Sequence, residues 1–117
     1  MKKINRVKKY REFKEILDKR HFKRSRVFTV YFRQNEFGFE RYGILITKKN
    51  GNAVVRNKIK RQIRSIIDNS TDFSNGYDII VVVSKKYSID EFSNNNVELT
   101  TILTSIREKK WKKKQKN

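Results

Sequence analysis

The sequence predicts a single α+β domain in which helices cover a small mixed sheet of three to four strands. Three observations lead to this fold class. Apolar residues recur at helical spacing in three segments, two runs rich in aromatic and β-branched residues have the composition of strands, and one continuous apolar run is short enough for a buried strand. The expected order is α-β-β-α-β-α, and the pattern alone leaves the sheet connectivity open.

The composition limits both the size of the protein and its partners. The 117 residues suffice for one hydrophobic core. Lys and Arg number 30 against 12 Asp and Glu, for a formal net charge of +18, so an anionic partner is expected, most simply a nucleic acid. There is no cysteine, no apolar run near 18 residues and no signal-peptide pattern, which favours a cytoplasmic protein without membrane contact.

The N-terminal part predicts a basic arm followed by a helix. Residues 1–9 are basic and lack a core pattern, so we expect a mobile or loosely docked arm. From Tyr10 to Lys19 the apolar residues fall at i, i+3, i+6 and i+7, which is one stripe of a helix. Its members are Tyr10, Phe13, Ile16 and Leu17.

Two strands follow, at residues 26–33 and 41–48. Both are rich in aromatic and β-branched residues, and a turn signal at Asn35 to Gly38 separates them. Their closeness in sequence predicts an antiparallel hairpin with a loop of several residues.

Asn50-Gly51-Asn52 is the strongest turn signal in the chain, because Asn and Gly tolerate positive φ. Asn52 is also a good cap for a helix from Ala53 to about Ile67. When this helix is drawn at 100° per residue, the core face holds Ile59, Ile63, Ile66 and Val55, with Ile67 at its edge. Arg and Lys gather on the shoulder and far side of the helix. A face of one sign favours a bound polyanion, although a merely solvated basic face remains the alternative.

The C-terminal third predicts a strand, a helix and a tail. Residues 77–84 form the continuous apolar run of a buried central strand. Ser88 to Glu91 has the spacing of a capping box, and a helix from Asn96 to about Trp111 is expected to turn Val97, Ile102, Leu103 and Ile106 inward. Residues 112–117 are a charged tail.

The turn and the basic helix carry a resemblance. Three segments of the sequence resemble the protein component of bacterial ribonuclease P. They are the run Lys48-Lys49-x-Gly-Asn-Ala-Val-x-Arg-Asn-Lys-Ile-Lys-Arg-x-Ile-Arg64, the upstream Arg6-Val-Lys-Lys with Phe13, and the Gly43-Ile-Leu-Ile-Thr-Lys-Lys strand. The family hallmark Arg-Asn-Arg stands here as Arg56-Asn57-Lys58. Tyr10 stands where the family usually has Asn, and Leu17 where a second aromatic is common.

The resemblance implies the subunit of a ribonucleoprotein endonuclease that removes the 5′ leader of precursor tRNA. In that family the RNA subunit cleaves with Mg²⁺, the basic helix faces the RNA, and a cleft between the first helix and the sheet holds the single-stranded leader. The implied RNA-binding residues are Lys48, Lys49, Asn52, Arg56, Asn57, Lys58, Lys60, Arg61 and Arg64. The implied leader-binding residues are Phe13, Lys14, Leu17, Phe28, Val30 and Tyr31, with pure core packing as the alternative for Phe13 and Leu17.

The sequence predicts no catalytic or metal-binding residues in the protein itself. His21 stands alone among cations, and no His, Asp or Glu cluster has metal-ligand spacing. The expected partners are ribonuclease P RNA and precursor tRNA, with Mg²⁺ held by RNA and no protein oligomer. The rival hypothesis is a structural RNA-binding protein, such as a ribosomal protein, which explains charge and size equally well.

Overall fold

A four-stranded mixed sheet lies at the centre of the computed structural model, which describes residues 1–116 and the side chains of residues 1–107. In the order β1-β2-β4-β3, the strands are β1 (Phe22–Arg24), β2 (Phe28–Gln34), β4 (Tyr77–Val83) and β3 (Arg41–Leu45). The helices are α1 (Tyr10–Asp18), α2 (Ala53–Ser70) and α3 (Phe92–Lys116), with short 3₁₀ turns at Lys3–Asn5, Lys48–Asn50 and Ile89–Glu91. The predicted α+β class and element order are confirmed, and the short edge strand β1 is an addition.

The pairing of the strands corrects the expected hairpin. β2 and β3 do not pair; β4 lies between them, antiparallel to β2 and parallel to β3. The physical reason lies in β4, which is almost wholly apolar and is buried along nearly its whole length. Such a strand needs a hydrogen-bonded neighbour on each side, and only the centre of the sheet provides two.

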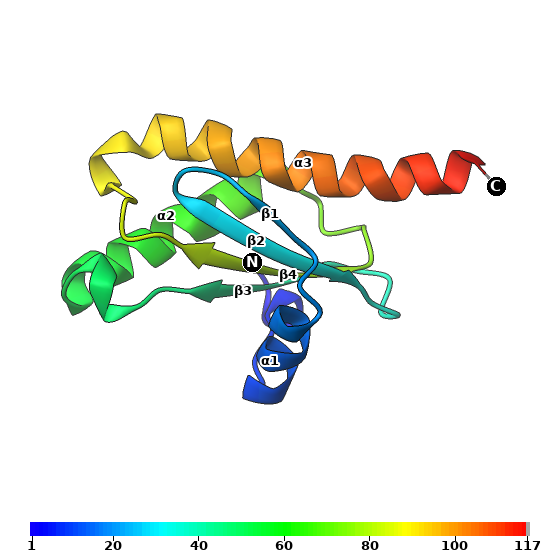
Figure 1. Ribbon diagram of the computed structural model, residues 1–117, viewed down its shortest axis with the longest axis horizontal. Helices are drawn as coiled ribbons and strands as arrows, with labels where there is room; N and C mark the ends of the chain where they lie inside the picture. Colours follow the sequence, from blue (N-terminus) through cyan, green and yellow to red (C-terminus); the bar gives the residue numbers. More distant parts are fainter. Residues whose placement is uncertain (117) are drawn as a thin grey trace.

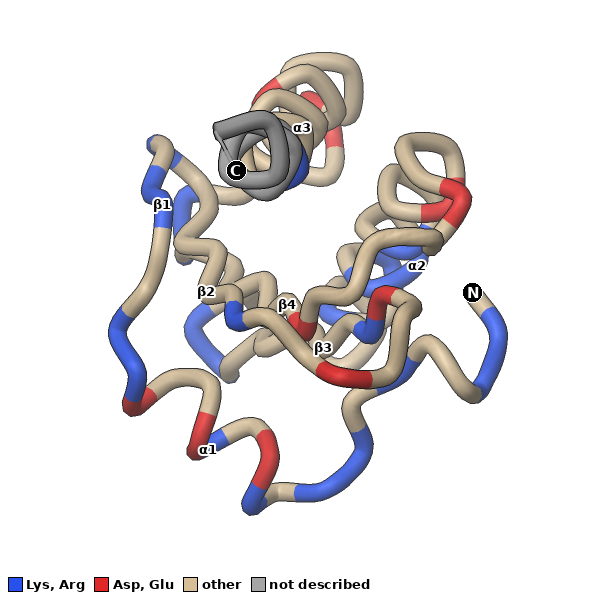
Figure 2. Tube along the Cα trace, turned by 90° about the vertical axis from the view of Figure 1, so that its right-hand side faces the viewer, with Lys and Arg blue, Asp and Glu red and all other residues tan. Residues whose placement is uncertain are grey.

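The helices cover the two faces of the sheet unequally. α2 and α3 lie together on one face, and α1 alone crosses the other (Figures 1 and 2). The main core lies under α2 and α3, where both helices point aliphatic side chains at the sheet. It includes Ile59, Ile63, Ile66 and Ile67 of α2 and Leu99, Ile102, Leu103 and Ile106 of α3, as predicted except for Leu99.

Val97 corrects the predicted inner face of α3. Its side chain is 67% exposed. Leu99, Ile102, Leu103 and Ile106 share one face by their i, i+3, i+4, i+7 spacing, and a residue two positions before Leu99 points about 200° away from it. The four regularly spaced residues from Leu99 to Ile106 decide which side of the helix faces the sheet, and Val97 lies on the opposite side.

The N-terminal arm is docked, contrary to the expectation of a mobile segment. Arg6 forms a parallel β-bridge with Tyr42, and Val7 is buried. The Asn5 side-chain amide donates to the Glu40 carbonyl at 2.7 Å, and the Met1 ammonium lies 2.8 Å from an Asp68 carboxylate oxygen. The arm is therefore fixed along the β3 edge and against α2, where its cations join those of the helix.

Candidate nucleic-acid interface

The start of α2 is built as the sequence predicts. Gly51 has a φ of 116°, a conformation that favours glycine, and the Asn52 side chain accepts a hydrogen bond from the Val55 amide at 3.0 Å. Because this cap and the Ile59 and Ile63 anchors fix the rotation of the helix, its polar side is held outward.

That polar side and the Lys48–Asn50 turn before it present a surface of cations. Seven of the predicted RNA-binding residues are cations, and within the described part of the chain none of them forms an ion pair: Lys48, Lys49, Arg56, Lys58, Lys60, Arg61 and Arg64. All are exposed except Arg56, which is half-buried; Asn52 and Asn57 are exposed as well. The single acid of α2, Asp68, is paired with the N-terminus. Unopposed cations held on one helix and on the turn that precedes it suit a phosphate backbone.

One flank of α2 meets the docked arm in a small basic pocket. The pocket holds about 160 Å³, and Arg6, Lys60 and Arg64 are among its lining residues. The Nε of Arg6 is buried and has no hydrogen-bond partner in the described part of the protein. A buried guanidinium nitrogen left open beside two other cations suits an anion. Arg6 was outside the predicted site, although its basic run Arg6 to Lys9 was a visible signal.

The opposite face of the sheet carries α1, which is held by a network of ion pairs. Asp78 of β4 accepts from Arg41 Nε at 2.8 Å and Nη2 at 2.9 Å, and from Arg33 Nε at 3.1 Å. The same two arginines reach α1, where Arg41 contacts Glu12 at 2.8 Å and Arg33 contacts Glu15 at 3.2 Å. The acidic side of α1 is thereby fixed toward one end of the sheet.

Burial raises the pKa of the Asp78 carboxyl, but hydrogen bonds from Arg41, Asn35 and Arg33 outweigh this and hold the pKa below its ordinary value. The hydrogen bond to Asp78 is also the main reason that the pKa of Arg41 is raised. Asp78 and Arg41 are thus both charged at neutral pH, and the network is structural.

Gly43 lets α1 approach the sheet closely. A Cβ at this position would lie 2.5 Å from the Phe13 Cζ and 2.7 Å from the Ile80 Cδ1. Such contacts are too close for carbon atoms, so a side chain here would force the Phe13 ring and the Ile80 side chain out of their places under α1. The resulting small core of Val7, Ile16 and Ile80 seats the helix over β4.

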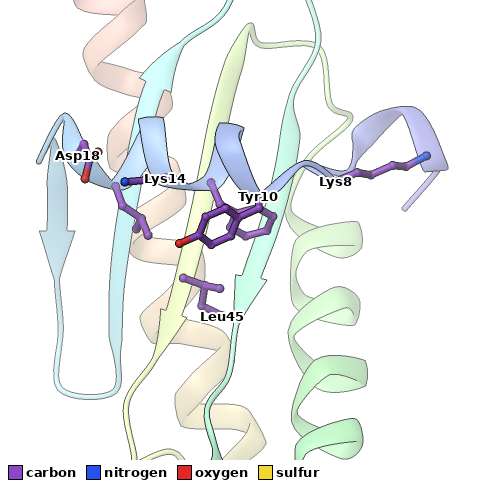
Figure 3. Close-up of a pocket in the computed structure, with 7 residues that line it drawn as sticks. Lys8, Tyr10, Lys14, Asp18 and Leu45 are labelled. Carbon is purple, nitrogen blue, oxygen red and sulfur yellow. The ribbon is translucent and has the colours of Figure 1, made fainter.

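An open groove remains beside α1 over the end of β3. It holds about 410 Å³ and is lined by Lys8, Tyr10, Phe13, Lys14, Leu17, Asp18 and Leu45. Tyr10 is 82% exposed, and Figure 3 shows its ring beside Leu45, with Lys14 on one side and the Lys8 side chain extending away on the other. The groove thus combines an apolar floor with an accessible aromatic ring and cations.

Three of the six predicted leader-binding residues line this groove: Phe13, Lys14 and Leu17. Tyr31 lies on the same face of the sheet, packed against the small core under α1, with its ring 5.3 Å from that of Phe22. Phe28 and Val30 are instead buried in the main core under α2 and α3. The expectation that these two residues line the groove is wrong, because alternate residues of a strand point to opposite faces.

The groove residues missed from the sequence are Lys8, Tyr10, Asp18 and Leu45. Tyr10 was expected in the core stripe, but it belongs to the first turn of α1 and overhangs the sheet instead. Leu45 was recognisable only by strand alternation, because it shares a face with Gly43.

No group of three or more His, Cys, Asp or Glu side chains suited to a metal occurs among the residues that the structure describes. Within the same part of the chain, no helix is long and apolar enough to cross a membrane.

Comparison with known proteins decides the family. The family model described as Ribonuclease P matches residues 1–107. The chain belongs to the ribonuclease P protein family. The ribonuclease P protein component of Mesoplasma florum is 42% identical over 101 residues, which cover 83% of this chain and 90% of the relative. That of Streptococcus agalactiae is 35% identical over 102 residues, covering 87% and 92%.

Solved ribonuclease P proteins share the fold. An RNase P protein mutant of Staphylococcus aureus with defective mRNA degradation activity superposes with a TM-score of 0.77 at 34% identity, covering 90% of each chain. The RNase P protein of Thermotoga maritima gives 0.69 at 30% identity, covering 86% of this chain and 93% of that one. The chain is therefore a protein subunit of ribonuclease P, a tRNA-processing endoribonuclease, and RNA is its partner.

Proposed function

We propose that this subunit divides its RNA contacts between the two sides of the fold. The cationic side of α2 binds the RNA subunit, and the groove beside α1 binds the single-stranded 5′ leader of precursor tRNA. Mg²⁺ held by RNA supplies the chemistry of cleavage, and the protein supplies affinity and position. No protein oligomer is part of this proposal.

The observation that carries the leader site is the exposed Tyr10 ring above an apolar floor. Unpaired bases stack on aromatic faces, and each such contact contributes about 1–3 kcal/mol. Lys8 and Lys14 provide cations for the phosphates of the same strand. Bases inside a duplex are already stacked on both sides, so this groove favours single-stranded RNA over paired RNA.

Phe13 and Leu17 contribute to packing and to the groove together. Both are half-buried, both pack against the small core under α1, and both line the groove. Core packing and leader binding are therefore compatible for these two residues. One side of each side chain packs against the small core, and the other side is available to a ligand.

The decisive experiment compares precursor tRNA with leaderless mature tRNA on the reconstituted holoenzyme. Tyr10→Ala should weaken precursor binding by about 5- to 140-fold, equivalent to about 1–3 kcal/mol, and leave mature tRNA binding unchanged. Phe37→Ala is the matched control, because Phe37 is also an exposed aromatic residue but lies outside the groove. Equal loss on both substrates would contradict a leader site.

An activity assay distinguishes the proposed function from the rival one, a structural RNA-binding protein. With a ribonuclease P RNA and precursor tRNA at low Mg²⁺, the subunit should promote release of the 5′ leader. A protein that binds the RNA and leaves leader release unchanged would support the structural role instead.

A further inference from the structure

A second concave surface lies on the flank of α2 that faces the start of α3. It encloses about 500 Å³ and is lined by Lys58, Arg61, Gln62, Ser65 and Phe92. Phe92 is the first residue of α3, and its side chain is 36% exposed although most of the large apolar residues of the protein are buried. We call this the α2–α3 pocket.

The hydrogen bonds around the pocket hold Phe92 in place. Gln62 Nε2 donates to the Ile89 carbonyl at 3.0 Å, and Gln62 Oε1 accepts from the Tyr87 hydroxyl at 2.7 Å. The Asn95 amide donates to the Ser88 carbonyl at 2.8 Å. The segment before α3 is thus tied to α2 and to α3 itself, so the backbone that carries Phe92 is held in place before any ligand binds.

The pocket offers three kinds of contact within a small space. Phe92 provides an accessible aromatic ring, and Lys58 and Arg61 provide cations that have no ion pair among the described residues. Ser65 provides an exposed hydroxyl. No carboxylate is among the lining residues. An aromatic ring beside two unopposed cations matches a base joined to its phosphate.

We propose that the α2–α3 pocket binds one unpaired nucleotide of the RNA that lies on α2, with the base stacked on Phe92 and the phosphate on Lys58 and Arg61. This inference rests on the proposed function, since it requires RNA on α2. The volume is of the size that small ligands occupy in proteins, about 300–1,000 Å³. A docked protein would require apolar area beyond one ring, and the other lining residues are polar.

The nucleotide is distinct from the leader, because the leader groove is on the other face of the sheet. Figure 2 shows α2 and α3 on one side of the strands and α1 on the opposite side. An RNA that carries a bulged or looped-out base opposite α2 therefore gains a contact that a continuous duplex does not, because every paired base is already stacked.

A tryptophan placed in the pocket tests the stacking directly. Trp111 is the only tryptophan of the chain, so Phe92→Trp in a Trp111→Phe background gives one fluorescent reporter. Val97→Trp in the same background is the matched control, because Val97 is an exposed residue of α3 outside the pocket. At saturation, a single-stranded oligoadenylate should quench the Phe92→Trp emission and leave Val97→Trp unchanged, and an RNA duplex of equal length should quench neither. Equal quenching of both reporters, or quenching by the duplex, overturns the proposal.

Affinity for a full-length ribonuclease P RNA provides the second measurement. Phe92→Ala should weaken binding roughly 5- to 140-fold, whereas Phe92→Tyr should keep the affinity of the parent. Parent and Phe92→Ala binding with the same affinity would refute the pocket and leave the proposed function intact. Failure of the parent itself to bind that RNA would instead refute the proposed function. Circular dichroism of each variant separates loss of a contact from loss of the fold.

Discussion

On one face of the sheet α2 and α3 pack aliphatic side chains against the strands, whereas on the other face α1 crosses alone and is held by ion pairs at one end. The first face contains the main core. The second has a much smaller core of Val7, Ile16 and Ile80, and it leaves Leu45 beside an open groove. The face under α2 and α3 therefore provides most of the stability of the fold. The α1 face can leave apolar surface available to a ligand without unfolding the domain.

The strongest test of this comparison is a cavity in the main core. Ile63 of α2 is fully buried, so Ile63→Ala should lower the free energy of unfolding by about 2–5 kcal/mol. Leu45→Ala on the groove face should cost clearly less, because Leu45 is only half-buried. Denaturant unfolding of both variants measures the difference, and equal losses would contradict the unequal roles of the faces.

The ion pairs under α1 provide the next test. Asp78→Asn removes the charge that three side chains contact, and should cost about 1.5–3 kcal/mol at pH 7. Because the pKa of Asp78 is lowered in the folded protein, its contribution is complete above the ordinary aspartate pKa of about 3.9 and is lost as the pH falls below it.

The Asn variant should therefore lose less stability than the parent when the pH is lowered from about 4 to 2. Urea unfolding of the parent and the variant at several pH values in this range measures the two free energies of unfolding. The exposed Asp90→Asn, which lies outside the network, should follow the parent throughout. An Asp78→Asn curve parallel to that of the parent would show that the network does not contribute through this charge.

A change at Gly43 should alter the groove face more than the main core. Gly43→Ala introduces a methyl group against Phe13, at an expected cost of about 1–3 kcal/mol, and shifts α1. The preference for precursor over mature tRNA should fall as the groove changes shape. Adding Phe13→Leu should restore part of the stability, and a double variant no more stable than Gly43→Ala would refute this contact as the cause.

The smallest expected effect concerns single phosphates on α2. Arg61→Ala and Arg64→Ala should each lower the slope of log affinity against log salt by about one unit, through loss of one phosphate contact. Lys19→Ala is the control, because Lys19 is an exposed cation at the end of α1 on the other face of the sheet. RNA binding at several salt concentrations provides the slopes; an unchanged slope in the Arg61, Arg64 double variant would exclude phosphate contacts there.

Local patterns predicted what local interactions decide. The Asn50-Gly51-Asn52 turn, the Asn52 cap and the inward isoleucines of α2 depend on neighbours within one or two turns, and each is found as expected. The cationic side of α2 followed from the same helical geometry. For this reason the sequence alone indicates which residues lie on the outer side of α2, while RNA binding by them stays a prediction.

Contacts between distant segments were beyond the sequence. The charges of residues 1–9 gave no indication that Asn5 would reach Glu40, or that Arg6 would pair with Tyr42. The hairpin prediction failed for the same reason, since the neighbours of β2 and β3 depend on a strand more than thirty residues further along. Strand alternation separates Phe28 and Val30 from Tyr31, but which of the two faces carries the groove depends on where α1 lies. The exposure of Tyr10 depends on the same packing of α1 against the sheet.

The central position of β4 also has a consequence for biosynthesis. β2 and β3 are made first, but they share no ladder, and the strand that joins them is residues 77–83. Until residues 77–83 have been synthesised, the edges of β2 and β3 that will pair with β4 have no hydrogen-bond partner. The basic nascent chain is then still incompletely folded. The β1–β2 pair can form earlier, but completion of the sheet must wait for the last third of translation, when one short apolar strand pairs with both β2 and β3.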